Sequence, residues 1–249
     1  MNVGLYQSAA SLSALERWQE AVSQNITSSQ TTGFRKRTVE FSAETAGNLN
    51  VNPYSKSSSG NEQPSIFTRA TNGVSFSGGE TEPTRNPLDV AIQGDGFFEL
   101  KKPDGSLAYT RSGQFQMRAD RTIVTAGDAE LLTSSGTPVV MQPTGEPLTV
   151  NRDGTVFQGA TSLGQLAIEK FANPGALLPA AGGLFTAGAG AGMSAVDKPN
   201  LMQGYLEGSN VQPLREMVDM VLISRAYEAN QKIISTVDQQ MDKTLQALG

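Results

Sequence analysis

The chain contains no cysteine and no histidine among its 249 residues. Without cysteine it cannot form a disulfide framework, a zinc–thiolate site or a thiol nucleophile. Without histidine it lacks the commonest general base and metal ligand, and the usual Ser-His-Asp triad is impossible. An enzyme built on this chain would need carboxylates, Lys, Tyr or a Ser–Lys pair, and no such group stands out. We therefore predict that the chain is not an enzyme and that it binds no metal or cofactor.

Charge is also sparse, since charged residues make up 17% of the chain and the formal net charge is −5. A nucleic-acid binder would show a basic stripe, so we predict no nucleic-acid partner. No window approaches the roughly 20 apolar residues of a membrane helix, which argues against membrane insertion. Residues 1–20 lack the basic start and apolar run of a secretory signal. By itself this indicates a cytoplasmic chain, or one exported without a cleaved signal peptide.

The first 32 residues carry apolar side chains at gaps of three and four, and Gly33 follows them. This spacing predicts one apolar face of a helix over residues 4–29. Trp18, the only tryptophan, lies on that face and is expected to pack there. The interface residues that we assign to this helix are Leu5, Leu12, Leu15, Trp18, Val22 and Ile26.

The last forty residues repeat this pattern. Ser209 and Asn210 are candidate caps, and Pro213 suits the first turn of a helix. A helix of about 35 residues would span about 53 Å, far more than the average globular helix. Its second half comes close to a heptad pattern, which is typical of a coiled coil. The interface residues assigned to it are Leu214, Met217, Val221, Ile234, Val237, Met241, Leu245 and Leu248.

The middle of the chain favours β-structure. Short β-branched or alternating runs are separated by turn pairs such as Asn72-Gly73, Asp104-Gly105 and Asp153-Gly154. Gly94-Asp95-Gly96 also lies between two such runs, so a hairpin turn explains it better than a nucleotide-binding fingerprint. Of Phe97 and Phe98, we expect one ring in a core and the other facing outward or a partner. Residues 47–63 read as a loop or extended arm, and composition leaves residues 172–195 open as a flexible or a tightly packed loop.

The terminal helices raise the question of what covers their apolar residues. A hairpin of the two helices would bury only one mutual seam and would leave several large apolar residues exposed. Five such residues at roughly 80 Å² each forgo about 10 kcal/mol, which is comparable with the stability of a whole domain. We therefore predict that other copies of the chain, or relatives of it, cover these helices. The alternative is that the helices lie against the β-rich middle.

Four blocks of residues resemble the flagellar basal-body rod and hook family of axial proteins. The most specific is Asn-Pro-Leu-Asp-Val-Ala-Ile-Gln-Gly-Asp-Gly-Phe-Phe at residues 86–98. The others are residues 24–35, residues 109–125, and residues 203–232. Residues 27–30 depart from the Ala-Asn-rich stretch that is usual there, and Asp120-Arg121 stands where Asp-Gly is usual. The motif positions are Asn25, Gly33, Phe34, Leu88, Gly94, Asp95, Gly96, Phe97, Phe98, Asn210, Arg225, Tyr227, Glu228 and Asn230.

The resemblance implies a structural subunit of the flagellar rod, the periplasmic drive shaft that transmits torque from motor to hook. Its partners would be copies of itself, same-family proximal and distal rod proteins, and the flagellar type III export apparatus. The length is short for a hook protein, and the length and C-terminal ending favour the proximal over the distal rod. Two readings without that role also remain, namely an oligomeric β-domain interaction protein and an enzyme using carboxylates.

The predicted architecture is α+β, with the two helices paired as a coiled-coil layer and a central all-β domain of short strands and hairpins. Residues 1–32 and 209–249 would form the inner layer, and residues 86–208 the central domain. Residues 33–85 would be an extended arm leading into the β region, with Gly33-Phe34-Arg35 setting its angle to the helix.

Overall fold

The computed structural model describes residues 3–50 and 62–248, which divide into two compact units. The first unit combines three separate segments, Met1–Thr27, Arg37–Gly73 and Gln212–Gly249. The second unit combines Ser28–Lys36 with Val74–Val211. Both ends of the chain thus belong to the same unit, and the β-rich middle forms the other.

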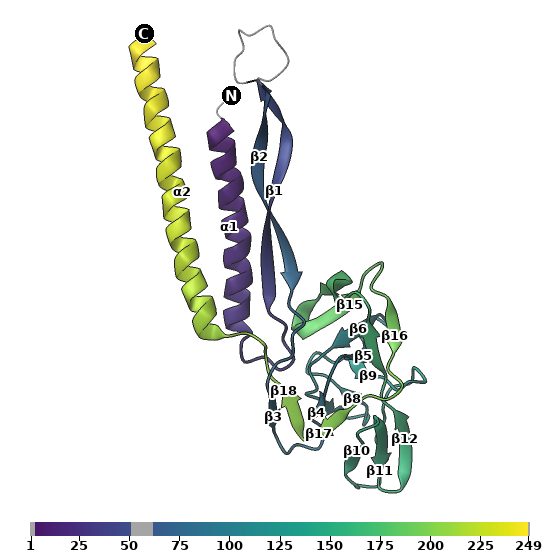
Figure 1. Cartoon of the computed structure of the whole chain (residues 1–249). Helices are drawn as coiled ribbons and strands as arrows, with labels where there is room; N and C mark the ends of the chain where they lie inside the picture. Colours follow the sequence, from purple (N-terminus) through teal and green to yellow (C-terminus); the bar gives the residue numbers. More distant parts are fainter. Residues whose placement is uncertain (1–2, 51–61, 249) are drawn as a thin grey trace. The chain divides into compact units, whose positions relative to one another are not determined.

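The first unit consists of two helices and one β-hairpin. Helix α1 spans Val3–Thr27 and helix α2 spans Pro213–Leu248, so both helices form where the apolar spacing predicts them. Pro213 is the first residue of α2, as expected for a residue without a backbone N–H. The strands β1 (Arg37–Asn50) and β2 (Glu62–Val74) pair with each other, as Figure 1 shows. Of the expected arm at residues 47–63, residues 51–61 lie outside the described part of the chain.

The β1–β2 hairpin lies along α1 and supplies the partner of Trp18. The Trp18 ring meets Phe41 of β1 edge to face, with ring centroids 5.7 Å apart. Arg17 Nη1 donates to the carbonyl of Ala70 at 3.2 Å, and Gln7 Nε2 donates to that of Ile66 at 3.0 Å. An isolated two-stranded hairpin is only marginally stable in water, so these contacts with α1 help to hold it.

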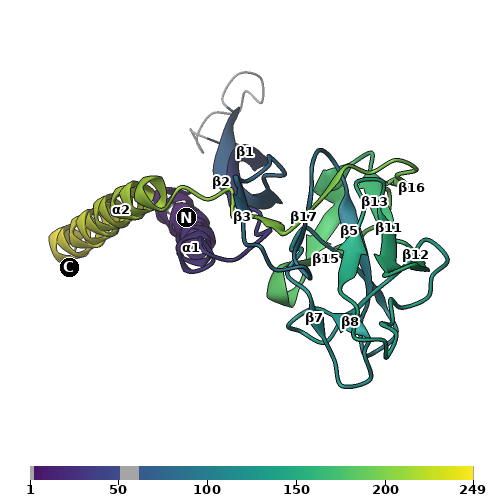
Figure 2. The same ribbon diagram turned by 90° about the horizontal axis from the view of Figure 1, so that it is seen from below.

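The prediction of a coiled-coil layer of paired helices is wrong. Three of the residues predicted for the seam, Leu214, Met217 and Val221, are at least half exposed instead of buried against α1. The helices contact each other near the start of α2 and then diverge, as Figures 1 and 2 show. The physical reason is that one side of α1 is already covered by the β1–β2 hairpin, which the periodicity of the helices does not reveal.

The second unit is a β-structure of short strands and two 3₁₀ turns. Its largest sheet has nine strands, seven of them in the order β14-β15-β6-β5-β9-β8-β7, with β13 pairing to β5 and β16. The smaller sheets are β10-β11-β12, β17-β4 and β18-β3. The strands, all antiparallel to their neighbours, are β3 (Thr81–Pro83), β4 (Val90–Ile92), β5 (Phe97–Lys101), β6 (Leu107–Thr110), β7 (Gln116–Met117), β8 (Ile123–Val124), β9 (Glu130–Leu131), β10 (Leu148–Val150), β11 (Thr155–Gln158), β12 (Thr161–Gln165), β13 (Ile168–Phe171), β14 (Leu177–Pro179), β15 (Leu184–Ala187), β16 (Met193–Ala195), β17 (Leu201–Gln203) and β18 (Tyr205–Glu207).

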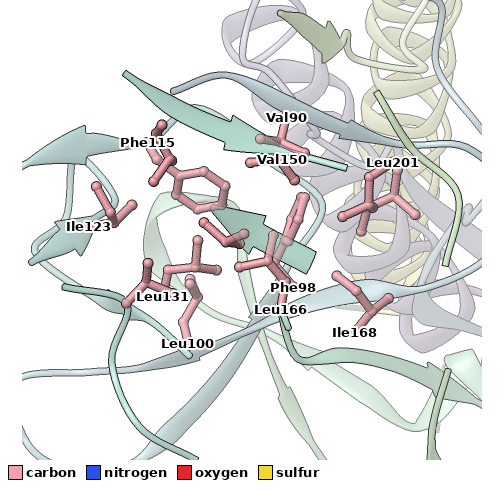
Figure 3. Close-up of a cluster of buried hydrophobic side chains, with 14 of the residues drawn as sticks. Val90, Phe98, Leu100, Phe115, Ile123, Leu131, Val150, Leu166, Ile168 and Leu201 are labelled. Atoms are coloured by element: carbon pink, nitrogen blue, oxygen red, sulfur yellow. The ribbon is translucent and has the colours of Figure 1, made fainter. Parts of the chain in front are cut away.

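One hydrophobic core joins most of these strands. Figure 3 shows Phe98, Phe115 and Ile123 converging in it with branched side chains from several strands. Phe98 and Phe115 meet edge to face at 5.2 Å. Because no long helix contributes, every element of this core is short and depends on its neighbours for burial.

Two local expectations in this unit are wrong. Gly94-Asp95-Gly96 is not a hairpin turn, because β4 pairs with β17 whereas β5 pairs with β6, so the three residues connect two sheets. Neither Phe97 nor Phe98 faces outward: Phe98 lies in the main core and Phe97 in a second cluster with Tyr109 and Phe171. The Gly/Ala-rich residues 172–195, left open by composition, contribute β14, β15 and β16, and Leu177 and Phe185 of this segment are buried in that second cluster.

Gly113 is expected to be intolerant of any side chain. Its carbonyl accepts from the N–H of Val90, and a Cβ at this position would overlap the Val90 carbonyl oxygen. We expect Gly113→Ala to destabilise the second unit by about 2–3 kcal/mol, measured by thermal unfolding. Gly127→Ala is the matched control, because the nearest atom to its new Cβ would be Thr125 Oγ1 at 4.0 Å. Equal melting temperatures for the two variants would contradict the steric argument.

Candidate assembly interface

Helix α2 presents an unburied apolar face. Leu214 is 81% exposed, Val218 58% and Leu222 50%, at a spacing of four that places them in one row. Met217, Val221 and Ile233 are also about half exposed. Monomeric proteins rarely leave so many large apolar side chains together in water, so this face is a candidate contact surface.

The opposite face of α2 packs toward α1 through a polar contact in the first turn of α2. Asn25 is fully buried, and its Nδ2 donates to Glu216 Oε2 at 2.8 Å. The same amide accepts from the N–H of Arg37 at 2.7 Å and donates to its carbonyl at 2.9 Å, as a neighbouring strand would. Asn25 therefore holds the start of β1 and the first turn of α2 to α1. Its side chain uses both its acceptor and its donors, which explains why an amide is needed here.

The predicted interface residues of the helices differ in their exposure. Val22 of α1 is buried, while Leu12, Leu15, Trp18 and Ile26 are half buried. Ile234 and Val237 of α2 are half buried as well. The side chains of Leu5, Met241, Leu245 and Leu248 lie outside the described part of the structure. Partial burial leaves each half-buried side chain with apolar surface for a further contact.

Four of the motif residues lie in α2 and differ in how far they are exposed. Tyr227 and Asn230 are half buried, and Asn230 Nδ2 donates to the carbonyl of Ala226 at 3.0 Å within the helix. Arg225 and Glu228 are exposed. These last two therefore add charge to the surface of α2 rather than to its packing.

A buried ion cluster lies in the second unit. Glu207 Oε2 accepts from Arg111 Nε at 2.6 Å, and Glu207 Oε1 accepts from Arg35 Nη1 at 2.8 Å. The N–H of Gly79 also donates to Oε1, at 2.8 Å. All three side chains are at least 94% buried, so solvent screens these charges little. Burial alone would raise the pKa of Glu207, but Arg111 and Arg35 outweigh it and hold this pKa below its ordinary value.

Arg111 also links this ion cluster to the glycine motif at residues 94–96 by hydrogen bonds. Its Nη2 donates to the carbonyl of Ile92 at 3.0 Å and to that of Gly94, and its Nη1 donates to that of Gly96. Positive φ angles of 96° and 140° turn Gly94 and Gly96 so that their carbonyls accept these bonds. The motif that resembled a ligand-binding loop is thus filled by an arginine of the same chain. Asp95 instead pairs with Lys170 at 2.8 Å on the surface.

Hydrogen bonds join three segments next to this ion cluster, residues 33–36, 75–79 and 207–211. We call these three segments the stem. The N–H of Gly33 donates to the carbonyl of Glu207 at 2.7 Å, with Gly33 at φ 67°. Asn210 does not cap α2; its Oδ1 accepts from the N–H of Lys36 at 2.6 Å, and its Nδ2 donates to the carbonyls of Ser75 and Ser77. Phe34 is buried beside them, whereas Leu88 is half buried against the main core. The motif positions Gly33, Phe34 and Asn210 thereby meet in the stem.

Neither a metal cluster nor a membrane-crossing helix is present in the parts of the chain that the structure describes. No group of three or more acidic side chains is arranged to hold a metal ion within residues 3–50 and 62–248. Over the same residues, neither helix combines the length and the apolar character that a membrane crossing needs.

Comparison with known proteins identifies the family of the chain. A family model described as "Flagellar basal body rod FlgEFG protein C-terminal" matches residues 202–247, and one described as "Flagellar hook protein FlgE/F/G D1 domain" matches residues 91–158. The flagellar basal-body rod protein FlgG of Agrobacterium fabrum is 32% identical over 93% of this chain and 94% of its own. The chain belongs to the flagellar basal-body rod family. The prediction of this family from the four motif blocks is therefore confirmed.

Relatives under two names match over most of the chain. FlgG of Borreliella burgdorferi is 32% identical over 94% of both chains. The rod protein FlgF of Mesorhizobium japonicum is less similar, at 26% identity, but its match covers 100% of this chain and 99% of its own. The D1 match contains the glycine motif and Arg111, while the C-terminal match begins at residue 202, just before the stem segment 207–211, and contains most of α2. Both features described above therefore lie mostly within the segments that match the family models.

Proposed function

We propose that this chain is a non-enzymatic structural subunit of the flagellar rod, assembling helically through its terminal helices. The observation that carries this is the exposed apolar face of α2 in a chain of a rod family. Covering roughly 70 Å² on each of its six large residues would contribute about 10 kcal/mol, before the entropy of association is subtracted. This free energy is sufficient for a stable contact only if neighbouring subunits bury most of the apolar face of α2. Subunits that meet in a repeated head-to-tail manner without closing a ring form a filament.

The parts of the chain would have different places in the rod. Residues 1–32 and 209–249 would form its inner layer, residues 86–208 would face outward, and residues 33–85 would be an arm between them. The stem, in this proposal, sets the angle at which the arm leaves the β-rich middle. Its support is the set of buried bonds that joins Gly33, Glu207 and Asn210.

The partners that we propose are copies of the chain, proximal and distal rod proteins of the same family, and the flagellar type III export apparatus. The rod would lie in the periplasm and carry torque from motor to hook. Of the two rod segments we propose the proximal one, with the distal rod as the alternative. Electron microscopy of basal bodies that contain a tagged copy would distinguish these two positions.

Deletion of α2 tests this function directly. In a strain whose own copy of the chain is removed, we expect the full chain to restore complete rods and swimming. A chain ending at residue 211 should restore neither, because it lacks the apolar face. The β-rich unit of the truncated chain should still fold, which one-dimensional NMR of the purified protein would show. Complete rods built with the truncated chain would overturn the proposal.

A further inference from the structure

A cavity of about 340 Å³ lies beside the stem within the second unit. One part of its wall is charged and contains Arg35, Arg111 and Glu207. Another part is aromatic, where Phe97 meets Phe76 and Phe171 with ring centroids 6.0 and 5.7 Å apart. These edge-to-face contacts keep the aromatic wall in place. The cavity thus combines fixed cations with a rigid apolar surface.

The charges that line this cavity do not balance. Arg35 and Arg111 are both buried, and both pair with the single carboxylate of Glu207. At the rim, Lys170 and Asp95 pair with each other at 2.8 Å and cancel. One positive charge therefore remains in a place that solvent screens poorly. Burial lowers the pKa of Arg35, and Glu207 offsets this only in part.

A hydrogen-bond donor is also unused at this place. Arg35 Nη1 donates to Glu207 and to the carbonyl of Ser77 at 2.9 Å. Its Nε, in contrast, is buried and has no acceptor among the described residues. Buried donors without an acceptor are rare and costly in folded proteins. The unused donor and the excess charge belong to the same guanidinium group.

We propose that this cavity binds a carboxylate carried on a short aliphatic group. The carboxylate would supply the missing negative charge beside the Arg35 guanidinium group, which forms strong ion pairs with carboxylates. Arg35 Nε is itself buried, so the side chain would have to rotate to donate to the ligand. The carbon chain behind it would lie against Phe76 and Phe171. Two sources offer this chemistry, a free small carboxylic acid and an aspartate or glutamate side chain from another copy of the chain.

NMR of the arginine Nε–H groups tests the proposal on the full-length protein. Sodium acetate is added at constant ionic strength, with acetamide as the neutral probe of equal shape. We expect acetate, and not acetamide, to produce a saturable shift of the Arg35 signal. A dilution series without acetate tests the second source, because a carboxylate from another copy would shift the same signal as protein concentration rises. Acetate would compete with that shift. No saturable change in either series would overturn the proposal.

Charge variants at the rim make the test quantitative without touching the buried cluster. Asp95→Asn leaves the site more positive and should tighten acetate binding roughly three- to tenfold. Lys170→Gln should weaken it by a similar factor. Arg152→Gln is the control, because Arg152 is exposed and does not line the cavity. Affinities that change equally in all three variants, or not at all, would show that the cavity does not hold the anion.

Discussion

Replacing Glu207 by alanine is expected to destabilise the β-rich unit by about 3–5 kcal/mol, the usual cost of removing one partner of a buried ion pair. The reason is that Arg35 and Arg111 would remain buried with no carboxylate between them. The N–H of Gly79 would lose its acceptor as well. Urea unfolding followed by the methyl NMR signals of Leu100 and Ile123, both in the main core, would measure the change.

Two further variants separate charge from shape. Glu207→Gln keeps the volume and one acceptor oxygen, so we expect a loss between that of the alanine variant and none. Glu80→Ala is the matched control, because Glu80 is an exposed carboxylate that flanks the stem. Trp18 belongs to the first unit, so its fluorescence checks that the helices still form. If Glu207→Ala unfolded within 0.5 kcal/mol of the natural chain, the ion cluster would have no structural role.

The same cluster predicts how stability depends on pH. The pKa of Glu207 is lower in the folded chain than its ordinary value, so its carboxylate is stabilised by folding. That contribution is fully present above the unfolded pKa of about 4.3 and is lost as pH falls through the folded value. The natural chain should therefore lose more stability than Glu207→Gln as the pH falls from about 5 to about 2, roughly the range over which such a carboxyl group titrates. Parallel curves for the two proteins would contradict this.

The helices could be predicted from the sequence because their signal is local. Gaps of three and four apolar residues, with Pro213 at one end and Gly33 beyond the other helix, place α1 and α2 within a few residues. The elements that pack against these helices could not be predicted in the same way. The partner of Trp18 is Phe41 on a strand, and a strand lying against a helix leaves no trace in the periodicity of the helix itself.

The buried ion cluster could not be predicted from the sequence, because its members are far apart in the chain. Glu207 and Arg111 are 96 residues apart in the chain, and neither was among the positions singled out. A signal was nevertheless present, since Arg111 and Glu207 each lie inside a motif block and have no other charged residue within six positions. A lone charge in such a block can mean a buried pair as well as a ligand site. Only the fold decides which carboxylate meets which guanidinium group.

Assembly itself should fail when the exposed row on α2 is made polar. We expect the triple variant Leu214→Gln, Val218→Gln, Leu222→Gln to weaken association of the purified chain by about three orders of magnitude, as the loss of roughly 4–5 kcal/mol of apolar burial implies. Glutamine is a good helix former and all three positions are at least half exposed in the single chain, so α2 should persist. Sedimentation over a range of concentrations would measure the association.

A control on the same helix distinguishes this face from the helix as a whole. Gln231→Glu combined with Asp238→Gln changes two exposed polar positions on another side of the helix, leaves the net charge unchanged, and should leave association nearly unchanged. Unaltered Trp18 fluorescence in both variants would show that the first unit remains folded. If the control weakened association as much as the triple variant, the apolar row would not be the contact surface. If neither variant did, the chain would assemble through another surface, and the role proposed for α2 would be wrong.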